Sequence, residues 1–376
     1  MIAARLPAFY IFAVNAIVDE HNYLDAAVAR QTAMDLKALL STDVFQPPAS
    51  AVDDRIGPLP LVDSMADAPA QAIAPAIGPV VVWAVDGGSA TLGRIGRIEI
   101  IAWRAGCVRF DDHRRLDQSC PPPDIMAYDR LEAAQLYDRR FPEAASGRIN
   151  GTLPDLAGGL RWLAEWRLVE RIITDHDASA GEILLLVDGS LRGNPDYGLE
   201  KQRTVLRLAA DKNIHVAAVS KQTGLTIDGR LPLDAAVGQS NGSTADSRPW
   251  HRRLSRPLAD DSGWLGDVYL ARLHPGADKA YRIDLNRYDS ANPSEIFSRL
   301  ASLADDIEFG GYPYPLAAAH RLARIDSGFK GEMIEVITRA LEQEGIPDDL
   351  RETFRRDSHG QLNADLETTT GTFHHG

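Results

Sequence analysis

The sequence predicts an α/β fold in which a mixed β-sheet is flanked by helices, with further helical segments at both ends of the chain. Three observations indicate it. Short apolar runs of strand length alternate with longer stretches whose apolar residues recur every three or four positions. Two of the apolar runs end in Asp-Gly, at Asp86 and Asp188. Hydrophobic residues make up 44% of the 376 residues and charged residues 25%, a composition typical of folded globular proteins.

The elements follow in order along the chain. Apolar periodicity predicts a helix over 23–40, and Pro- and Ala-rich residues 46–78 predict a connector. Residues 111–150 have no regular pattern, and the sequence after 346 lacks an apolar face. The predicted strands cover residues 80–85, 98–103, 106–110, 183–187, 215–219, 268–273 and 281–285. The predicted helices cover residues 156–173, 199–210, 294–304, 316–325 and 330–341.

These elements divide the chain into three parts. We expect an N-terminal helical extension and linker over 1–60, an α/β domain over 61–345, and a flexible C-terminal tail over 346–376. Residues 1–16 have the composition of a short signal peptide, but Pro7 interrupts their apolar run, so we expect them to pack on the domain.

Charge and cysteine content exclude several classes of protein. A net charge of −13 argues against a polybasic protein that coats nucleic acid by charge alone. Cys107 and Cys120 are too few for a disulfide framework and fit no zinc spacing. No apolar run reaches the length of a membrane span. We therefore expect a cytoplasmic protein with no membrane association.

Asp86 and Asp188 are the first candidates for chemistry. Each follows an apolar strand and is followed by Gly and then Ser, in DGGS at 86–89 and DGS at 188–190. A single Asp-Gly is more often a turn, because Gly adopts positive φ without strain. Two such motifs joined by strands and a helix predict that both carboxylates reach one edge of the sheet. Adjacent carboxylates repel each other unless a cation lies between them, which favours Mg²⁺ or Mn²⁺.

The helix between these motifs can supply a third carboxylate. Glu165 and Glu170 both flank its apolar stripe, and a spacing of five residues places them about 140° apart around the helix, so periodicity does not choose between them. The ordinary alternative for either is a solvent-exposed charge paired with Arg161 or Arg167.

The last predicted site residues lie near the C-terminal helices. Tyr312 and Pro315 precede or begin a helix that contains His320. A lone helical histidine is more often structural, but near a phosphodiester metal site an imidazole can act as ligand, proton donor or phosphate contact. Lys221, at the end of a predicted strand, can reach a phosphate, although most lysines are simply solvated.

The order of these elements is that of an RNase H-like nuclease, in which two metal ions about 4 Å apart activate water and stabilise the leaving oxygen. The sequence also resembles one family more specifically. The segments VVVWAVDGGSA, LLLVDGSL, VAAVSKQTG, VYLARLHP with YRIDL, and GYPYPLAAAHRLARI occur in this order between about residue 80 and residue 327. Together they are similar to NurA nucleases.

The resemblance implies an Mn²⁺-dependent single-strand endonuclease and 5′–3′ exonuclease with an RNase H-like domain, acting in DNA end resection and double-strand break repair; Mg²⁺ is the alternative metal. It implies a homodimer that docks on a HerA-type hexameric ATPase. Residue by residue, it implies that Asp86, Glu165, Asp188, Tyr312 and His320 are catalytic, and that all of these except Tyr312 hold metal.

Two features of the chain depart from the family pattern. They are DGGS rather than DGS at the first motif, and a longer loop, TDHDASAGE, before the second. The longer loop leaves the choice between Glu165 and Glu170 open. Because the net charge of −13 offers little affinity for DNA over the whole surface, we expect DNA contacts in a local basic groove with Lys221, Arg321 and Arg324.

Two other functions compete with the nuclease. Phosphotransferases of the sugar-kinase and actin type also have a strand that runs into Asp-Gly-Gly and cradles a phosphate. They require an adenosine-binding Gly-rich segment as well, and nothing in residues 222–345 resembles one. A non-catalytic adaptor of a hexameric ATPase is the alternative from a different class, and the presence of all five site residues argues against it.

Overall fold

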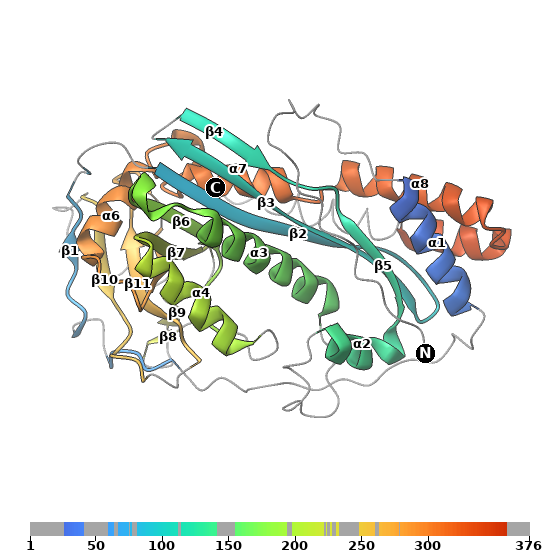
Figure 1. Cartoon of the computed structure of the whole chain (residues 1–376), viewed down its shortest axis with the longest axis horizontal. Helices are drawn as coiled ribbons and strands as arrows, with labels where there is room; N and C mark the ends of the chain where they lie inside the picture. The colour runs from blue at the N-terminus through green and yellow to red at the C-terminus, as the bar shows by residue number, and fades with distance from the viewer. Residues whose placement is uncertain are drawn as a thin grey trace.

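A single twisted β-sheet runs through the molecule, with helices packed on both of its faces (Figure 1). The computed structural model describes residues 26–40, 59–63, 67–74, 76, 81–111, 114–140, 155–193, 198–221, 223, 226–227, 231–232, 248–259, 263–277 and 279–358. The predicted packing of residues 1–16 and most of the predicted connector lie outside these residues.

Ten strands of the described residues form this sheet, in the order β1-β10-β11-β12-β7-β6-β2-β3-β4, and β5 pairs with β3 beside β4. The sheet is mixed, because parallel strands lie at its centre and antiparallel strands on either side. The strands are β1 (Gln71–Ala72), β2 (Val81–Ile95), β3 (Ile98–Asp111), β4 (Arg114–Ser119), β5 (Asp124–Asp129), β6 (Ile183–Asp188), β7 (Ile214–Ser220), β10 (Trp250–Arg253), β11 (Gly266–Arg272) and β12 (Tyr281–Asn286), with β8 (Thr226–Ile227) and β9 (Leu231–Pro232) in a separate hairpin.

The centre of the sheet has the predicted RNase H-like arrangement. Strands β2, β3 and β4 are antiparallel neighbours, while β6 and β7 run parallel to β2 on its other side. Helix α3 (Leu156–Asp175) connects the antiparallel strands to β6, and α4 (Leu199–Asp211) connects β6 to β7. The predicted fold class is therefore confirmed.

Strand β2 is longer than the sequence predicts, and this changes the position of Asp86. The predicted strand ends at residue 85, but β2 continues to Ile95. Gly87 and Gly88 pair with Ala105 and Arg104 of β3, so Asp86 lies inside a strand rather than at its end. The predicted end of the strand at residue 85 is wrong because β3 continues as an unbroken partner alongside both glycines.

The second Asp-Gly motif behaves as predicted. Strand β6 ends at Asp188, and Gly189 adopts a φ of +100°. Parallel pairing of β2 with β6 ends at Val85 and Val187, so Asp86 and Asp188 are the next residues on two adjacent strands. Beyond this point β2 pairs, among the described strands, only with β3, since its pairing with β6 has ended.

Residues 98–140 also differ from the prediction. The two strands predicted over 98–103 and 106–110 are one strand, β3, and the segment predicted to be irregular contains β4, β5 and helix α2 (Ala133–Arg140). All six residues of β4 are exposed, so the sequence RRLDQS has no alternation of apolar and polar residues that could predict it.

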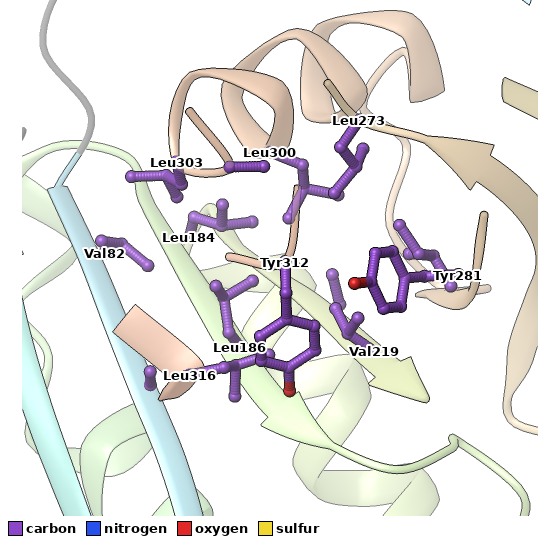
Figure 2. Packing of buried hydrophobic residues seen from close by; sticks show 14 of the residues in the cluster. Val82, Leu184, Leu186, Val219, Leu273, Tyr281, Leu300, Leu303, Tyr312 and Leu316 are labelled. Atoms are coloured by element: carbon purple, nitrogen blue, oxygen red, sulfur yellow. The ribbon is translucent and has the colours of Figure 1, made fainter. Parts of the chain in front are cut away.

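Two layers of helices enclose the parallel strands. Helices α3 and α4 cover one face, where Val169 and Leu206 pack against Leu185 and Val216 of the sheet. Helices α6 (Pro293–Ser302) and α7 (Tyr314–Ala323) cover the other face. Figure 2 shows Tyr312 on this side, its ring among the apolar side chains and its hydroxyl pointing away from Leu300 and Leu303.

The predicted terminal helices pack together at the far end of the β2–β3 hairpin. Ala33 and Leu36 of α1 (Ala26–Leu40) share an apolar cluster with Met333 and Ile337 of α8 (Ser327–Gln343) and with the hairpin. No helix among the described ranges is long and apolar enough to cross a membrane.

The prediction of a loose tail from residue 346 fails for its first part. Residues 348–358 form a further helix, and Phe354 and Ser358 are fully buried. Phe354 packs close to Gly93 of β2, where the lack of a side chain leaves room for its ring. The prediction is wrong for this segment because one buried aromatic residue replaces the apolar stripe that the sequence lacks. The rest of the tail, 359–376, lies outside the described residues.

Candidate active site

The ends of the paired central strands bring two carboxylates together. Asp86 is 2% exposed, and its Oδ1 accepts a hydrogen bond of 2.7 Å from the backbone N–H of Gly87. The Asp188 side chain is 27% exposed. Burial raises the pKa of Asp188, and the nearby charge of Asp86 raises it further. The two groups are therefore close enough to repel each other, as the twin motifs predict.

Helix α3 supplies the third carboxylate from Glu165. This residue is 3% exposed, and its Oε1 lies 2.5 Å from Nη1 of Arg161, one turn earlier in the helix. Burial raises the pKa of Glu165 to about 8; the charges of Asp86 and Asp188 add to the increase, and the charge of Arg161 opposes it. Glu165 thus belongs to the same electrostatic cluster as the two aspartates.

Glu170 lies outside this cluster. Its side chain is 38% exposed and forms an ion pair of 2.7 Å with Lys201 of α4. Glu170 is therefore a solvent-accessible helix charge with a basic partner. The structure places Glu165, and not Glu170, beside Asp86 and Asp188.

Gly87 makes the approach of Glu165 possible. A Cβ atom at this position would lie 2.4 Å from Oε1 of Glu165 and 2.8 Å from Cγ of Arg161. Side chains alternate between the faces of a strand, so Gly87 faces α3 while Asp86 and Gly88 face α7. The missing side chain of Gly87 leaves space on the α3 face of β2, and Glu165 and Arg161 occupy it next to Asp86.

Tyr312 and His320, from the α7 side of the sheet, and Lys221, at the end of β7, complete the cluster. The hydroxyl of Tyr312 donates a hydrogen bond of 3.0 Å to Oδ1 of Asp188, and Nδ1 of His320 lies 2.8 Å from Oδ2 of Asp86. Nζ of Lys221 lies 3.7 Å from Oδ2 of Asp188 and 5.0 Å from the centre of the Tyr312 ring. Burial raises the pKa of Tyr312, as does the neighbouring Asp188, so its hydroxyl keeps the proton that it donates.

A buried arginine that the sequence analysis missed holds the end of α7. Arg104 is 4% exposed, and it donates hydrogen bonds of 2.9 Å to the carbonyl of Ala323 and 2.6 Å to that of Arg324. Its guanidinium also lies over the ring of Phe329, 4.7 Å from the ring centre. The sequence signal for this role is an arginine, Arg104, in the middle of the mostly apolar segment IIAWRAGC.

Gly88 allows the same helix end to approach the sheet. A Cβ atom at Gly88 would lie 2.3 Å from the carbonyl oxygen of Ala323. Arg104 is the cross-strand partner of Gly88. The two residues together hold the carboxyl end of α7 against the sheet, one turn after His320. Both glycines of the DGGS motif are therefore required by close packing.

The two other predicted basic residues lie on α7 and its end without reaching the carboxylates in any recorded contact. Arg321 forms an ion pair with Glu308 and lies over the ring of Phe309. The side chain of Arg324 is exposed, and the carbonyl of the same residue accepts from Arg104. Their contact with DNA stays a prediction.

The three carboxylates have the chemistry of a hard-cation site, but they are not arranged as a finished one. Within the described ranges, no group of three or more His, Cys, Asp and Glu side chains has the geometry to hold a metal ion. Each carboxylate is instead bonded to its own partner: Asp86 to His320, Asp188 to Tyr312, and Glu165 to Arg161. Their mutual repulsion is relieved when a cation joins them, so the donor set fits Mg²⁺ or Mn²⁺ once Arg161 releases or shares Glu165.

Comparison with known proteins supports the sequence resemblance over part of the chain. Residues 164–325 match the model of the NurA domain family. This range includes Glu165, Asp188, Tyr312 and His320, while Asp86 comes from the strand before it. Comparison with curated proteins finds no match to the sequence.

Several solved structures are similar to this chain at low identity. The NurA nuclease from Sulfolobus solfataricus is 19% identical, with a TM-score of 0.49, and the match covers 74% of this chain and 89% of that chain. The catalytic domain of human endonuclease V is 14% identical, with a TM-score of 0.36 and coverage of 65% and 81%. Endonuclease V from Ciona intestinalis, in complex with a 24mer DNA, is 9% identical, with a TM-score of 0.36 and coverage of 65% and 84%.

The similarity to these structures is too low to carry an argument about activity, so the family match rests on the sequence. It joins the helix that carries Glu165 to the helix that carries His320 in one continuous unit. The resemblance seen in the sequence is confirmed over this range: residues 164–325 of the chain match the NurA domain family.

Proposed function

We propose that this protein is a metal-dependent DNA nuclease that hydrolyses phosphodiester bonds at the cluster of Asp86, Glu165 and Asp188. The observation that carries the proposal is the convergence of these three carboxylates, two from the range that matches the NurA domain and Asp86 from the strand β2 before it. Three mutually repelling carboxylates, two of them buried, are costly to hold together unless a cation binds them, and such a cation is what a phosphodiesterase requires at its reaction centre.

Mn²⁺, or Mg²⁺ in its place, would be held by Asp86, Glu165 and Asp188, with His320 as a further candidate ligand. When bound there, such a cation would supply water activation and would offset negative charge on the leaving oxygen. Oxygen ligands on rigid strands and a helix suit either ion. Arg161, which becomes available when Glu165 turns to a cation, is well placed to meet the negative charge of a phosphate.

The remaining residues have separate roles in this proposal. Tyr312 holds Asp188 in a fixed orientation through its hydroxyl, and the Lys221 ammonium offsets part of the excess negative charge. His320 directs Nδ1 at Asp86, and its side chain is 45% exposed, which leaves Nε2 to meet the phosphate or the leaving group. His320 therefore acts as proton donor or phosphate contact in our proposal.

The biological setting is proposed from the family resemblance. We infer single-strand endonuclease and 5′–3′ exonuclease activity in DNA end resection and double-strand break repair. The protein would act as a homodimer that receives DNA from a HerA-type hexameric ATPase, with local contacts from Lys221, Arg321 and Arg324. Its net charge of −13 is consistent with a need for such a partner, because the surface as a whole attracts DNA weakly.

One alternative loses support from the geometry. In a phosphotransferase of the sugar-kinase and actin type, the Asp-Gly-Gly segment forms a loop whose N–H groups bind phosphate. Here Gly87 and Gly88 lie within the β2–β3 ladder, and Glu165 and Ala323 occupy the space above and below them. A non-catalytic adaptor remains the competing function, and activity measurements separate the two.

The test is cleavage of an end-labelled single-stranded oligonucleotide with and without Mn²⁺, by the wild-type protein and by Asp86→Asn. We expect metal-dependent cleavage by the wild type and a loss of about 10³-fold or more in the variant, which loses a ligand charge without losing volume. Absence of metal-dependent cleavage in the folded wild type would support the adaptor and reject the proposal.

A further inference from the structure

A second candidate binding feature lies beside the first turn of α3, apart from the carboxylate cluster. It is a cavity of about 240 Å³ between that turn, strands β2, β3 and β5, and the residues that follow β5. Its apolar walls come from Ile101, Ala133, Leu156 and Ala157. A cavity of this size with apolar walls is large enough for one planar ring system such as a nucleobase.

Polar groups of the cavity separate into an inner and an outer set. Inside, Glu99 accepts hydrogen bonds of 2.7 Å from the Tyr128 hydroxyl, 3.1 Å from Thr91 and 2.8 Å from Nη2 of Arg94. Although burial opposes the charged form, these hydrogen bonds lower the pKa of Glu99. At the mouth, the side chains of Arg94 and Arg130 are 41% and 31% exposed, against 9% for Glu99.

The acidic residues of the cavity are already engaged, and the arginines keep donors to spare. The carboxylate of Asp155 caps the backbone N–H of Gly158. Arg94 uses Nε and Nη2 on Glu99, and Arg130 stays 3.9 Å from that carboxylate, beyond hydrogen-bond distance. The mouth thus presents guanidinium groups to solvent, while the interior presents apolar walls and the Glu99 carboxylate, which the hydroxyl groups of Thr91 and Tyr128 already bind.

The cavity lies in line with the carboxylate cluster along α3 and β2. Ala157, Arg161 and Glu165 are spaced four residues apart, so they share one side of the helix, and the first is about 12 Å from the last. On β2, Gly87 contacts Glu165 and Arg161, and Thr91 lines the cavity about 13 Å further along the same face. The distance along α3 and the distance along β2 therefore agree. The partly exposed Arg161 lies between the carboxylate cluster and the cavity.

We propose that this cavity binds one unpaired nucleotide of the strand whose phosphodiester lies at the carboxylate cluster, and this rests on the proposed function. The base enters between Ile101 and Ala157, its phosphate lies against Arg94 and Arg130, and Arg161 meets the backbone on the way. At 3.4 Å for each stacked nucleotide, a separation of about 12 Å corresponds to three or four nucleotides, and to fewer if the strand is stretched.

The consequence is a preference for single strands longer than the distance between the two sites. A duplex cannot present a base to the cavity unless that base leaves its stack, at a cost of a few kcal/mol. Binding of the base and its phosphate therefore adds affinity only for an unpaired strand that reaches the cavity.

The test measures binding without cleavage, using the full chain, Ca²⁺ in place of Mn²⁺ and fluorescent oligothymidylates of about two to ten nucleotides. For the wild type we expect the affinity to rise about tenfold at the first oligonucleotide length that spans both the carboxylate cluster and the cavity. Each nucleotide added before or after that length should change the affinity only slightly. Arg130→Gln should remove this step and lower the salt slope of binding by about 0.7, the value for one phosphate contact on a single strand. Arg356→Gln, at a side chain that is 73% exposed, is the control with the same change in charge and should keep the step.

A second variant separates base binding from charge. Ala157→Phe fills the cavity with a ring and leaves every charge in place. Because no base can then enter the cavity, this variant should bind a strand with one abasic residue as well as it binds an intact strand. In the wild type, an abasic residue at the position that reaches the cavity should weaken binding about fivefold or more. Thermal unfolding of each variant verifies that it is folded.

The outcomes also distinguish this proposal from the proposed function. If affinity rises smoothly with length and Arg130→Gln behaves like Arg356→Gln, the cavity does not bind the strand, whatever the protein cleaves. If the step is present and depends on Arg130 while the wild type cleaves no DNA with Mn²⁺, the cavity binds a nucleotide and the nuclease function is wrong.

Discussion

Gly87 is the residue on which the geometry of the carboxylate cluster depends most directly. Its missing side chain is the space into which Glu165 and Arg161 extend, at 2.4 and 2.8 Å from an ideal Cβ position. We predict that Gly87→Ala lowers the cleavage rate by about 10²-fold, because it displaces one carboxylate from the other two. Gly331→Ala in α8, where an added Cβ meets nothing within 4 Å, is the control, and it should raise the free energy of unfolding by about 0.5–1 kcal/mol.

Rates and melting temperatures of the two variants verify this prediction. Gly87→Ala should lose activity far out of proportion to any loss of stability, because Glu165 can turn toward solvent as the new methyl group takes its place. Activity within a few-fold of the wild type would show that the close contact of Gly87 with Glu165 has no bearing on the reaction.

At the scale of an element, α7 depends on the sheet for its position. Its carboxyl end is fixed by the two hydrogen bonds of Arg104, and His320 lies one turn before that end. We predict that Arg104→Met lowers the free energy of unfolding by about 1.5–3 kcal/mol, the loss expected for a charge-assisted hydrogen bond, and that amide exchange accelerates over residues 320–325. Arg104→Lys, which keeps the charge and can bond one carbonyl, should be intermediate; equal exchange in all three proteins would contradict this role.

The elements also show what the sequence could predict and what it could not. Buried strands such as β6 and amphipathic helices such as α3 were predictable, because their apolar spacing reports burial directly. Strand β4 was not, since all its residues are exposed, and the extent of β2 was not, because pairing with β3 overrides the turn preference of Gly-Gly. The family resemblance favoured Glu165 over Glu170. Only the structure separates the two, because Glu165 packs against Gly87 beside the aspartates while Glu170 forms an ion pair with Lys201.

At the scale of the whole molecule, a buried histidine ties the sheet together at the end opposite the carboxylate cluster. His215 lies at the start of β7, and its Nδ1 is 2.6 Å from Asp289, which follows β12. Its Nε2 is hydrogen-bonded to Glu182, which precedes β6. Glu182 in turn pairs with Arg299 of α6. Burial favours the neutral imidazole, but the hydrogen bonds and charges of Asp289 and Glu182 prevail and raise the pKa of His215.

This raised pKa has a defined effect on stability. A group whose folded-state pKa exceeds its unfolded value of about 6.5 contributes its full stabilisation below that pH and loses it as the pH rises through the folded value. We predict that the difference in unfolding free energy between the wild type and His215→Gln is largest below a pH of about 6.5 and shrinks as the pH rises above it. The total decrease should be about 1.4 kcal/mol for each unit by which folding raises the pKa of His215. Denaturant titrations across this pH range measure it, and a difference that grows with pH would contradict the pairing.

The central claim is that three carboxylates from two layers of the fold form one metal-binding reaction centre. Metal-titrated cleavage of one labelled single strand by Glu165→Gln and Glu170→Gln tests it most directly, because these neighbouring glutamates of one helix differ in burial and in partner. We predict that Glu165→Gln raises the Mn²⁺ concentration for half-maximal activity and lowers kcat by about 10²-fold or more, which is about 3 kcal/mol of transition-state stabilisation, while Glu170→Gln stays within a few-fold of the wild type. An inactive Glu170→Gln beside an active Glu165→Gln would contradict the account.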